Sequence, residues 1–220
     1  MLPSRLVFVC LWLMALRAAP IAAQNLRAQQ LFAEGLDYQF GKGGLKVDAQ
    51  QALDHYLQAI HDDPDFFKPL YSAGFIYYER GDLGNARKYL GMAISAARGK
   101  SAADEAMAST AYGGCYLKEG KHREAEKWLR AAVRLNPTLP EAHVNLINCY
   151  LAQDRVAEAR RAITDARLQA PHPIYQKLEA RIAGNEGWGL TTPEGLRALG
   201  IAAAVGLILV VVMRLRRRPV

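Results

Sequence analysis

Two cysteine–tyrosine pairs, Cys115-Tyr116 and Cys149-Tyr150, are the residues whose types and spacing first suggest chemistry. They lie 34 residues apart, and the third cysteine of the chain, Cys10, lies in an apolar stretch near the amino terminus. Two cysteines can form a disulfide, contribute to a metal site or act as a redox pair. They can also be one structural position that occurs twice in a repeat.

Other combinations that support catalysis or metal binding are missing from the sequence. A zinc site needs histidines and cysteines at short, regular spacings, and neither carboxylates nor cysteines stand at such spacings from His55, His61, His122, His143 and His172. The stretch GKGGLK lacks the spacing and the preceding strand of a phosphate-binding loop. No Gly-x-Ser-x-Gly motif occurs, and neither cysteine of the two pairs has a nearby base. We therefore expect no enzyme activity, no cofactor and no metal.

Internal repetition explains the two pairs better. Residues 106–139 align with residues 140–173 at a shift of 34. The matched residues are Cys115 with Cys149, Tyr116 with Tyr150, Ala125 with Ala159, Ala132 with Ala166, and Pro137 with Pro171. Similar spacings occur earlier in the chain, in Gly74, Tyr77, Gly81, Ala86, Leu90 and Ala93, and in Gly35, Tyr38, Ala52, Tyr56, Ala59 and Pro64.

This pattern of a small residue, Tyr, Ala, a large residue, Ala and Pro resembles the tetratricopeptide repeat (TPR) family. The resemblance implies an all-α fold, a TPR α-solenoid of about four helix pairs that must stack to bury their apolar faces. The predicted array covers residues 24–184, with units at about 28–65, 67–100, 106–139 and 140–173 and a capping helix at 173–184. The Gly-rich insertion in the first unit resembles the Sel-type variant. The added stretch ARGKSAADEA predicts a longer joint before the third unit.

The resemblance also implies a concave groove lined by one face of the first helix of each unit, with an extended or helical protein segment as the partner. Aromatic and Met residues on such a surface are typical of protein binding, although packing between neighbours is the alternative role for Phe32, Phe75 and Tyr78. The predicted groove residues are Phe32, Leu36, Phe40, Tyr71, Phe75, Tyr78, Met107, Thr110, Leu117, Val144 and Asn148. Lysine is missing where the family's peptide-carboxylate clamp would need it, since Tyr71 and Thr110 stand there.

The two ends of the chain predict a membrane protein. Residues 1–23 have the layout of a signal peptide, with Arg5, an apolar run at 6–16 and small residues before a cleavage point after Ala23. An uncleaved anchor is the alternative. Residues 196–213 approach the ~20 apolar residues that a transmembrane helix needs. A tether at 185–195 precedes this helix, and a basic tail at 214–220 follows it.

The net charge of +7 does not indicate nucleic-acid binding, because the excess lies at the ends. Residues 24–193 hold 21 Lys and Arg against 20 Asp and Glu, so the predicted folded part is close to neutral. Nucleic-acid binding needs cations clustered on the folded body.

The sequence therefore predicts a membrane-anchored TPR scaffold or adaptor that takes part in assembling an envelope complex. Its groove would lie on the extracytoplasmic side, in a bacterial periplasm, with the carboxyl terminus in the cytoplasm. The alternative is a self-associating structural subunit. Gly200 and Ala204, like Ala202 and Gly206, have the small-xxx-small spacing that permits transmembrane helices to pair.

A topology reporter fused after Val220 tests the predicted orientation. Arg214, Arg216, Arg217 and Arg218 close the apolar segment, and such clusters remain in the cytoplasm. We expect a reporter that is active only in the cytoplasm to be active in this fusion. Activity of a periplasm-specific reporter at the same position would show that the orientation is wrong.

Overall fold

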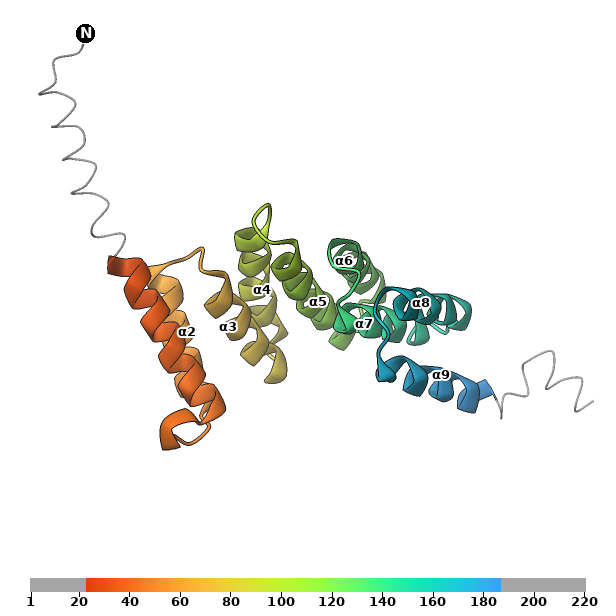
Figure 1. Ribbon diagram of the computed structural model, residues 1–220, viewed down its shortest axis with the longest axis horizontal. Coiled ribbons are helices and arrows are strands. Elements are labelled where there is room, and N and C mark those ends of the chain that lie inside the picture. Colours follow the sequence, from red (N-terminus) through yellow and green to blue (C-terminus); the bar gives the residue numbers. More distant parts are fainter. Residues whose placement is uncertain (1–22, 187–220) are drawn as a thin grey trace, which may run out of the picture. The chain divides into compact units, whose positions relative to one another are not determined.

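The computed structural model describes residues 23–186, which form helices joined by turns and contain no strand. Residues 23–40 are helical and are followed by the 3-10 turn η1 (Lys42–Gly44). The next helices are α2 (Ala49–Asp62), α3 (Phe67–Glu79), α4 (Leu83–Ala97), α5 (Ala102–Lys118), α6 (His122–Leu135), α7 (Pro140–Leu151), α8 (Val156–Gln169) and α9 (Pro173–Glu186) (Figure 1). The all-α prediction is confirmed for these residues.

The membrane segments predicted from the sequence lie almost entirely outside this range. Residues 1–22 of the predicted signal peptide, the predicted span at 196–213 and the basic tail at 214–220 are not among the described residues. Among residues 23–186, no helix combines the length and apolar character needed to cross a bilayer.

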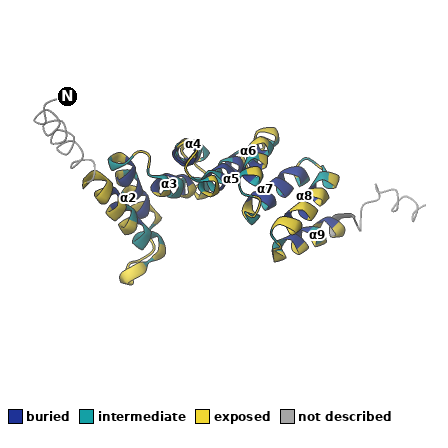
Figure 2. Ribbon diagram, turned by 45° about the horizontal axis from the view of Figure 1, so that its top comes forward, coloured by how far each residue is buried: buried dark blue, intermediate teal, exposed yellow. Residues whose placement is uncertain are grey.

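Consecutive helices pair, and each pair packs on the next. α3 packs on α4, α5 on α6 and α7 on α8, while α2, α4 and α6 also contact the helix that follows them. α5 contacts both α3 and α7, so these three helices lie side by side. In Figure 2 the buried residues, in dark blue, lie on the helix faces that turn toward neighbouring helices.

Glycines permit the close approach of the two helices within a pair. A Cβ atom at Gly74 of α3 would lie 2.7 Å from Leu90 Cγ of α4, and one at Gly113 of α5 would lie 2.9 Å from Leu129 Cγ of α6. Both leucines are fully buried. Any side chain at either glycine would force the helices apart or displace the leucine.

The turns within the pairs also recur. Gly81 and Gly120 have φ values of 79° and 71°, and Asp154, at the equivalent place in the turn before α8, has φ 57°. It is the single residue other than glycine with a positive φ among residues 23–186. Aspartate tolerates this left-handed conformation better than most residues.

The joint before the third unit differs from the prediction. The added residues do not form a longer loop, because α5 begins at Ala102 and absorbs most of them as extra helix. The Ser101 side chain accepts a hydrogen bond from the Asp104 amide at 3.2 Å, and Asp104 and Glu105 stand in the first turn. An amino-terminal cap followed by acidic residues stabilises the start of a helix, and the prediction underestimated this signal.

The chain divides into two compact units, one ending at Ala170 and the other beginning at Pro171. The described part of the second unit is α9, in which Tyr175, Leu178 and Ile182 form an apolar stripe. This helix continues through Asn185 and Glu186, which the sequence analysis placed in the tether. Its role as a cap stays a prediction.

Replacing Gly74 with alanine tests the close approach. We expect Gly74→Ala to lower the free energy of unfolding by about 1–3 kcal/mol, because the new methyl group overpacks the contact with Leu90. Gly91→Ala is the matched control: its Cβ would meet nothing closer than Tyr112 at 3.6 Å. Within a helix, such a change should raise the free energy of unfolding by roughly 0.5–1 kcal/mol. Denaturant unfolding measures both, and equal effects would contradict the packing argument.

Candidate protein-binding groove

A row of aromatic rings runs along one face of α3. Phe67, Tyr71, Phe75 and Tyr78 stack in sequence, with ring centroids 5.8, 6.3 and 6.1 Å apart. The interplanar angles are 20°, 20° and 30°. This spacing follows from helix geometry, since residues three and four apart occupy the same face. The row gives α3 a continuous aromatic surface.

The last three rings of this row form one wall of a cavity of about 430 Å³ between α3, α5 and α7. We call this cavity the groove pocket. Its lining residues are Tyr71, Phe75 and Tyr78 of α3, Met107, Thr110, Ala111 and Gly114 of α5, and Leu139, Glu141 and Asn145 at the start of α7. The lining is predominantly apolar.

Tyr78 is held in place from α5. The Lys118 Nζ atom lies 3.6 Å from the centroid of its ring and donates a hydrogen bond to its backbone oxygen at 3.0 Å. A Cβ atom at Gly114 would lie 3.4 Å from the Tyr78 hydroxyl oxygen, so glycine leaves room for the ring. Phe75 is 38% exposed and presents its ring to the solvent in the pocket.

Burial raises the pKa of both tyrosines of the pocket. For Tyr71 the negative charge of Glu141 adds to the effect of burial, and for Tyr78 nearby Cys115 and Glu79 add to it. Both phenols are therefore neutral at physiological pH. Glu141, which is exposed, is the one acidic side chain among the lining residues.

The structure brings together five of the predicted groove residues, namely Tyr71, Phe75, Tyr78, Met107 and Thr110. The other six do not line the groove pocket. Phe32 packs between Tyr56 and Phe66, with ring centroids 5.5 Å from each, and Leu36 packs against the same core. These contacts give both side chains a packing role, and their part in binding stays a prediction.

Four of those six residues have different surroundings. Phe40 is 62% exposed at the end of the first helix, and Leu117, Val144 and Asn148 are half-buried away from the groove pocket. On α7 the pocket uses Glu141 and Asn145 instead of Val144. Asn145 lies one helical turn after Glu141, and this spacing of four places both side chains on the face of α7 at the pocket.

Comparison with known proteins identifies the family. Two tetratricopeptide repeat models match the sequence, one at residues 76–140 and one at residues 116–182. The chain belongs to the tetratricopeptide repeat family. The Sel-type likeness of the first unit stays a prediction. No curated protein matches the sequence.

Solved TPR structures share this fold. PilF of Pseudomonas aeruginosa has a TM-score of 0.58 and 17% identity, over 83% of this chain and 74% of that chain. A MamA crystal structure has a TM-score of 0.55 and 19% identity, over 70% of this chain and 76% of that one. The first TPR domain of Spaghetti (RPAP3), bound to the HSP90 peptide SRMEEVD, has a TM-score of 0.50 and 20% identity. The match covers 59% of this chain and 95% of that chain. These likenesses concern the fold alone.

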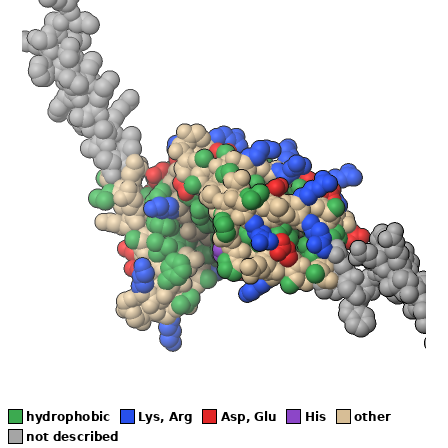
Figure 3. All heavy atoms as spheres, turned by 45° about the vertical axis from the view of Figure 1, so that its right-hand side comes forward, with side chains coloured by type: hydrophobic (Ala, Val, Ile, Leu, Met, Phe, Trp, Pro, Cys, Tyr) green, Lys and Arg blue, Asp and Glu red, His purple; other side chains and the backbone are tan. Residues whose placement is uncertain are grey.

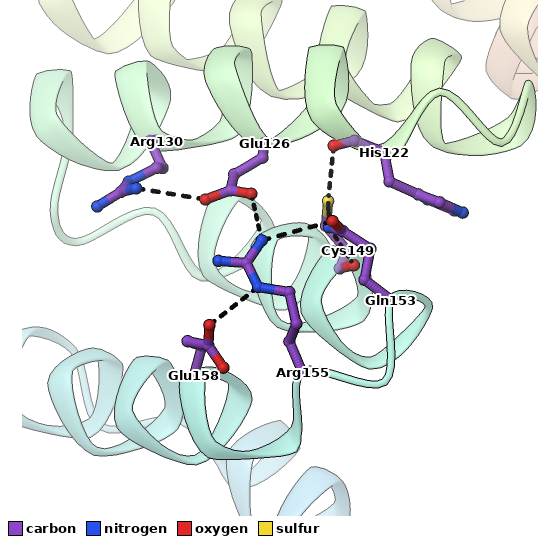
Figure 4. Close-up of polar contacts among 7 residues, drawn as sticks. All are labelled: His122, Glu126, Arg130, Cys149, Gln153, Arg155 and Glu158. Carbon is purple, nitrogen blue, oxygen red and sulfur yellow. Dashed lines mark hydrogen bonds and ion pairs between the residues drawn. The ribbon is translucent and has the colours of Figure 1, made fainter.

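A polar cluster centred on Arg155 joins the last two TPR pairs (Figure 4). The Arg155 guanidinium donates to Glu126 of α6 at 2.6 Å and to Glu158 of α8 at 2.9 Å, and it lies 4.6 Å from the ring centroid of Tyr150. Arg130 also donates to Glu126, at 3.3 Å. The hydrogen bond from Arg155 lowers the pKa of Glu158. These mutual contacts satisfy the charges internally, which indicates a structural role.

Both cysteines of the TPR array are free and buried, as the repeat register predicts. Cys149 Sγ donates to the backbone oxygen of His122 at 3.2 Å and accepts a hydrogen bond from Gln153 at 3.4 Å. Cys115 packs with Ala86 and Leu90. In the part of the chain that the structure describes, no three His, Cys, Asp or Glu side chains are grouped to hold a metal ion.

Thiol reactivity tests this assignment. Burial raises the pKa of Cys115 to about 11 and also raises the pKa of Cys149, where Glu126 adds to the effect. The reactive thiolate is therefore scarce at pH 8, about 0.1% for Cys115. We expect both thiols to react slowly with an aromatic disulfide reagent in the native protein and quickly in denaturant. A Cys115–Cys149 disulfide on peptide mapping would contradict the assignment.

Proposed function

We propose that this TPR scaffold is an adaptor that binds a segment of a partner protein in the groove pocket. The observation that carries the proposal is the aromatic wall of Tyr71, Phe75 and Tyr78 beside an open cavity of about 430 Å³. Aromatic residues around a partly exposed apolar pocket are the usual anchors of protein–protein recognition.

The dimensions and lining of the pocket favour a bulky apolar side chain of the partner. Met107 is flexible and adapts to different shapes, while the stacked rings of α3 are rigid. Full burial of one large apolar side chain contributes about 1.5–3 kcal/mol. The groove pocket therefore fits a segment that places a Leu, Met or aromatic residue between α3 and α5.

The charge of the pocket favours a basic residue beside that apolar one. Glu141 lies at the pocket and has no hydrogen-bond or ion-pair partner among the described residues, so a Lys or Arg of the partner can pair with it. RPAP3 binds a peptide that carries two glutamates and an aspartate. An acidic peptide would face Glu141 here, and the groove lacks the lysines of a carboxylate clamp.

We also propose that the adaptor is anchored in a membrane and displays the groove outside the cytoplasm, where it serves the assembly of an envelope complex. The support comes from the sequence of the two ends: the leader-like residues 1–23, the apolar segment 196–213 and the basic tail. A short stretch between α9 and the apolar segment would hold the TPR array close to the bilayer.

Photocrosslinking in the native membrane tests the groove. A photoreactive residue placed at Phe75 should capture a partner, and the same residue at Leu168, which is 77% exposed on α8, should not. Capture from both positions or from neither would contradict binding at the groove pocket. Capture of a second copy of this chain would instead favour a self-associating subunit.

Titration of the protein with the captured segment, as a synthetic peptide, then measures how much individual side chains contribute to the binding affinity. We expect Phe75→Ala to weaken binding by about fivefold or more, because an anchor residue typically contributes over 1 kcal/mol. Leu168→Ala is the matched control and should not change the affinity. Glu141→Gln should weaken binding mainly at low salt. Thermal unfolding should be nearly unchanged for all three variants, because each side chain is at least one-third exposed.

A further inference from the structure

The loop from Phe40 to Val47, which joins the first helix to α2, has no role in the groove or in the stacking of helix pairs. We call it the glycine loop. It is closed at its base by a hydrogen bond from the Asp48 amide to the Tyr38 oxygen at 2.9 Å, and within it the Leu45 amide donates to the Lys42 oxygen at 3.2 Å. It extends from one end of the first helix pair, drawn in orange in Figure 1. The other connections inside helix pairs are shorter.

Exposed apolar side chains concentrate in this loop. Phe40 is 62% exposed, Leu45 43% and Val47 70%. Among the residues that the structure describes, the other large hydrophobic side chains with comparable exposure are Leu26, Phe75 and Leu168. Half of these six side chains therefore fall within eight consecutive residues, and this exposure is costly in water unless another phase covers the loop.

The charges of the glycine loop all have one sign. Lys42 and Lys46 are exposed, and no acidic residue lies between Asp37 and Asp48. The Asp48 carboxylate accepts hydrogen bonds from the amides of Gln50 and Gln51, at 2.8 and 3.0 Å, where it caps α2. Its charge is therefore offset by the amino-terminal end of that helix, and the loop presents a positive surface.

We propose that the glycine loop docks on a lipid bilayer that carries anionic headgroups. Phe40, Leu45 and Val47 would enter the boundary between headgroups and acyl chains, while Lys42 and Lys46 would extend toward the phosphates. Each lysine near an anionic surface strengthens docking by about fivefold. The inference rests on the proposed membrane anchoring, which would bring the chain to a bilayer surface.

The form of the loop favours a bilayer over a protein partner. An apolar side chain of a partner is desolvated on several sides where it enters a hollow, such as the groove pocket. The apolar side chains of the glycine loop stand exposed around three glycines with φ of 66°, 66° and 81°, and the loop does not line the groove pocket. On the surface that Figure 3 draws, hydrophobic side chains lie exposed among Lys and Arg side chains. The glycine loop combines both types within eight consecutive residues.

Site-directed spin labelling of the full chain in vesicles tests the proposal. A nitroxide is attached to Val47→Cys, or to Leu168→Cys as the control, in a chain whose three native cysteines are alanine. Collision rates with oxygen, which concentrates in the bilayer, are compared with those of a water-soluble nickel complex. In vesicles of mixed zwitterionic and anionic lipids, we expect the oxygen-to-nickel ratio to rise several-fold at residue 47 and to keep its aqueous value at residue 168.

A second variant separates docking from anchoring. Lys42→Gln with Lys46→Gln should lower the local docking equilibrium about 25-fold and return residue 47 to the aqueous ratio, while the chain still floats with the vesicles. If the chain with both lysines floats with the vesicles but the label at residue 47 shows the aqueous ratio, the docking of the loop is overturned. The proposed anchor and the proposed groove are not affected by that result. Failure to float would overturn both the anchor and the docking. Protection of residue 47 only after a partner protein is added would also overturn the proposal.

Discussion

The structure depends on the distance of closest approach between the two helices of each pair. Gly35 against Tyr56, Gly74 against Leu90 and Gly113 against Leu129 repeat one contact in which a large buried side chain fills the space a Cβ atom would need. Because the glycine faces the partner helix, the other face of the same helix is turned to the groove. The aromatic row of α3 and the groove pocket are therefore consequences of where the glycines stand. The fourth pair has Ile147 in place of the glycine, so its helices must meet differently.

Polar contacts between pairs add specificity to this packing. Arg80 of the second pair donates to Gln50 of the first at 2.7 Å, Arg87 of the second pairs with Glu119 of the third, and Arg155 of the fourth donates to Glu126 of the third. Such partly exposed contacts contribute little to stability individually. They favour one register of stacking over others, since a shifted register would separate the charges. Each junction has its own arginine, which distinguishes the neighbouring pairs from one another.

The repeat register was predictable because its signals are periodic: a small residue, a tyrosine and alanines recur at fixed spacings, and each spacing has a packing reason. The same register placed Tyr71, Phe75 and Met107 on the face that lines the groove pocket. For Phe32 the register left groove binding and packing between neighbours open, because the family pattern describes a helix face without the neighbours, Tyr56 and Phe66, that its ring contacts. The register also did not show that α5 would begin at Ala102 and absorb the added residues, because the repeat spacing marks an insertion without saying whether it is loop or helix. The Ser101 cap and the acidic first turn stabilise the start of α5 at Ala102. A pattern of residue spacings does not include such local energies.

The groove pocket and the glycine loop illustrate how the surroundings of a hydrophobic residue restrict what it can bind. Phe75 lies in a hollow with the acidic residue Glu141 at its edge. A partner's side chain that enters this hollow is buried on several sides, and Glu141 favours a basic residue next to it. Phe40 lies on a glycine loop with two positive charges, where a rigid partner would contact few of its atoms. A fluid interface can cover such a loop because it deforms around it and supplies negative charge in any orientation. The same residue type thus favours a specific protein segment at the groove pocket and an unspecific, charged bilayer surface at the glycine loop.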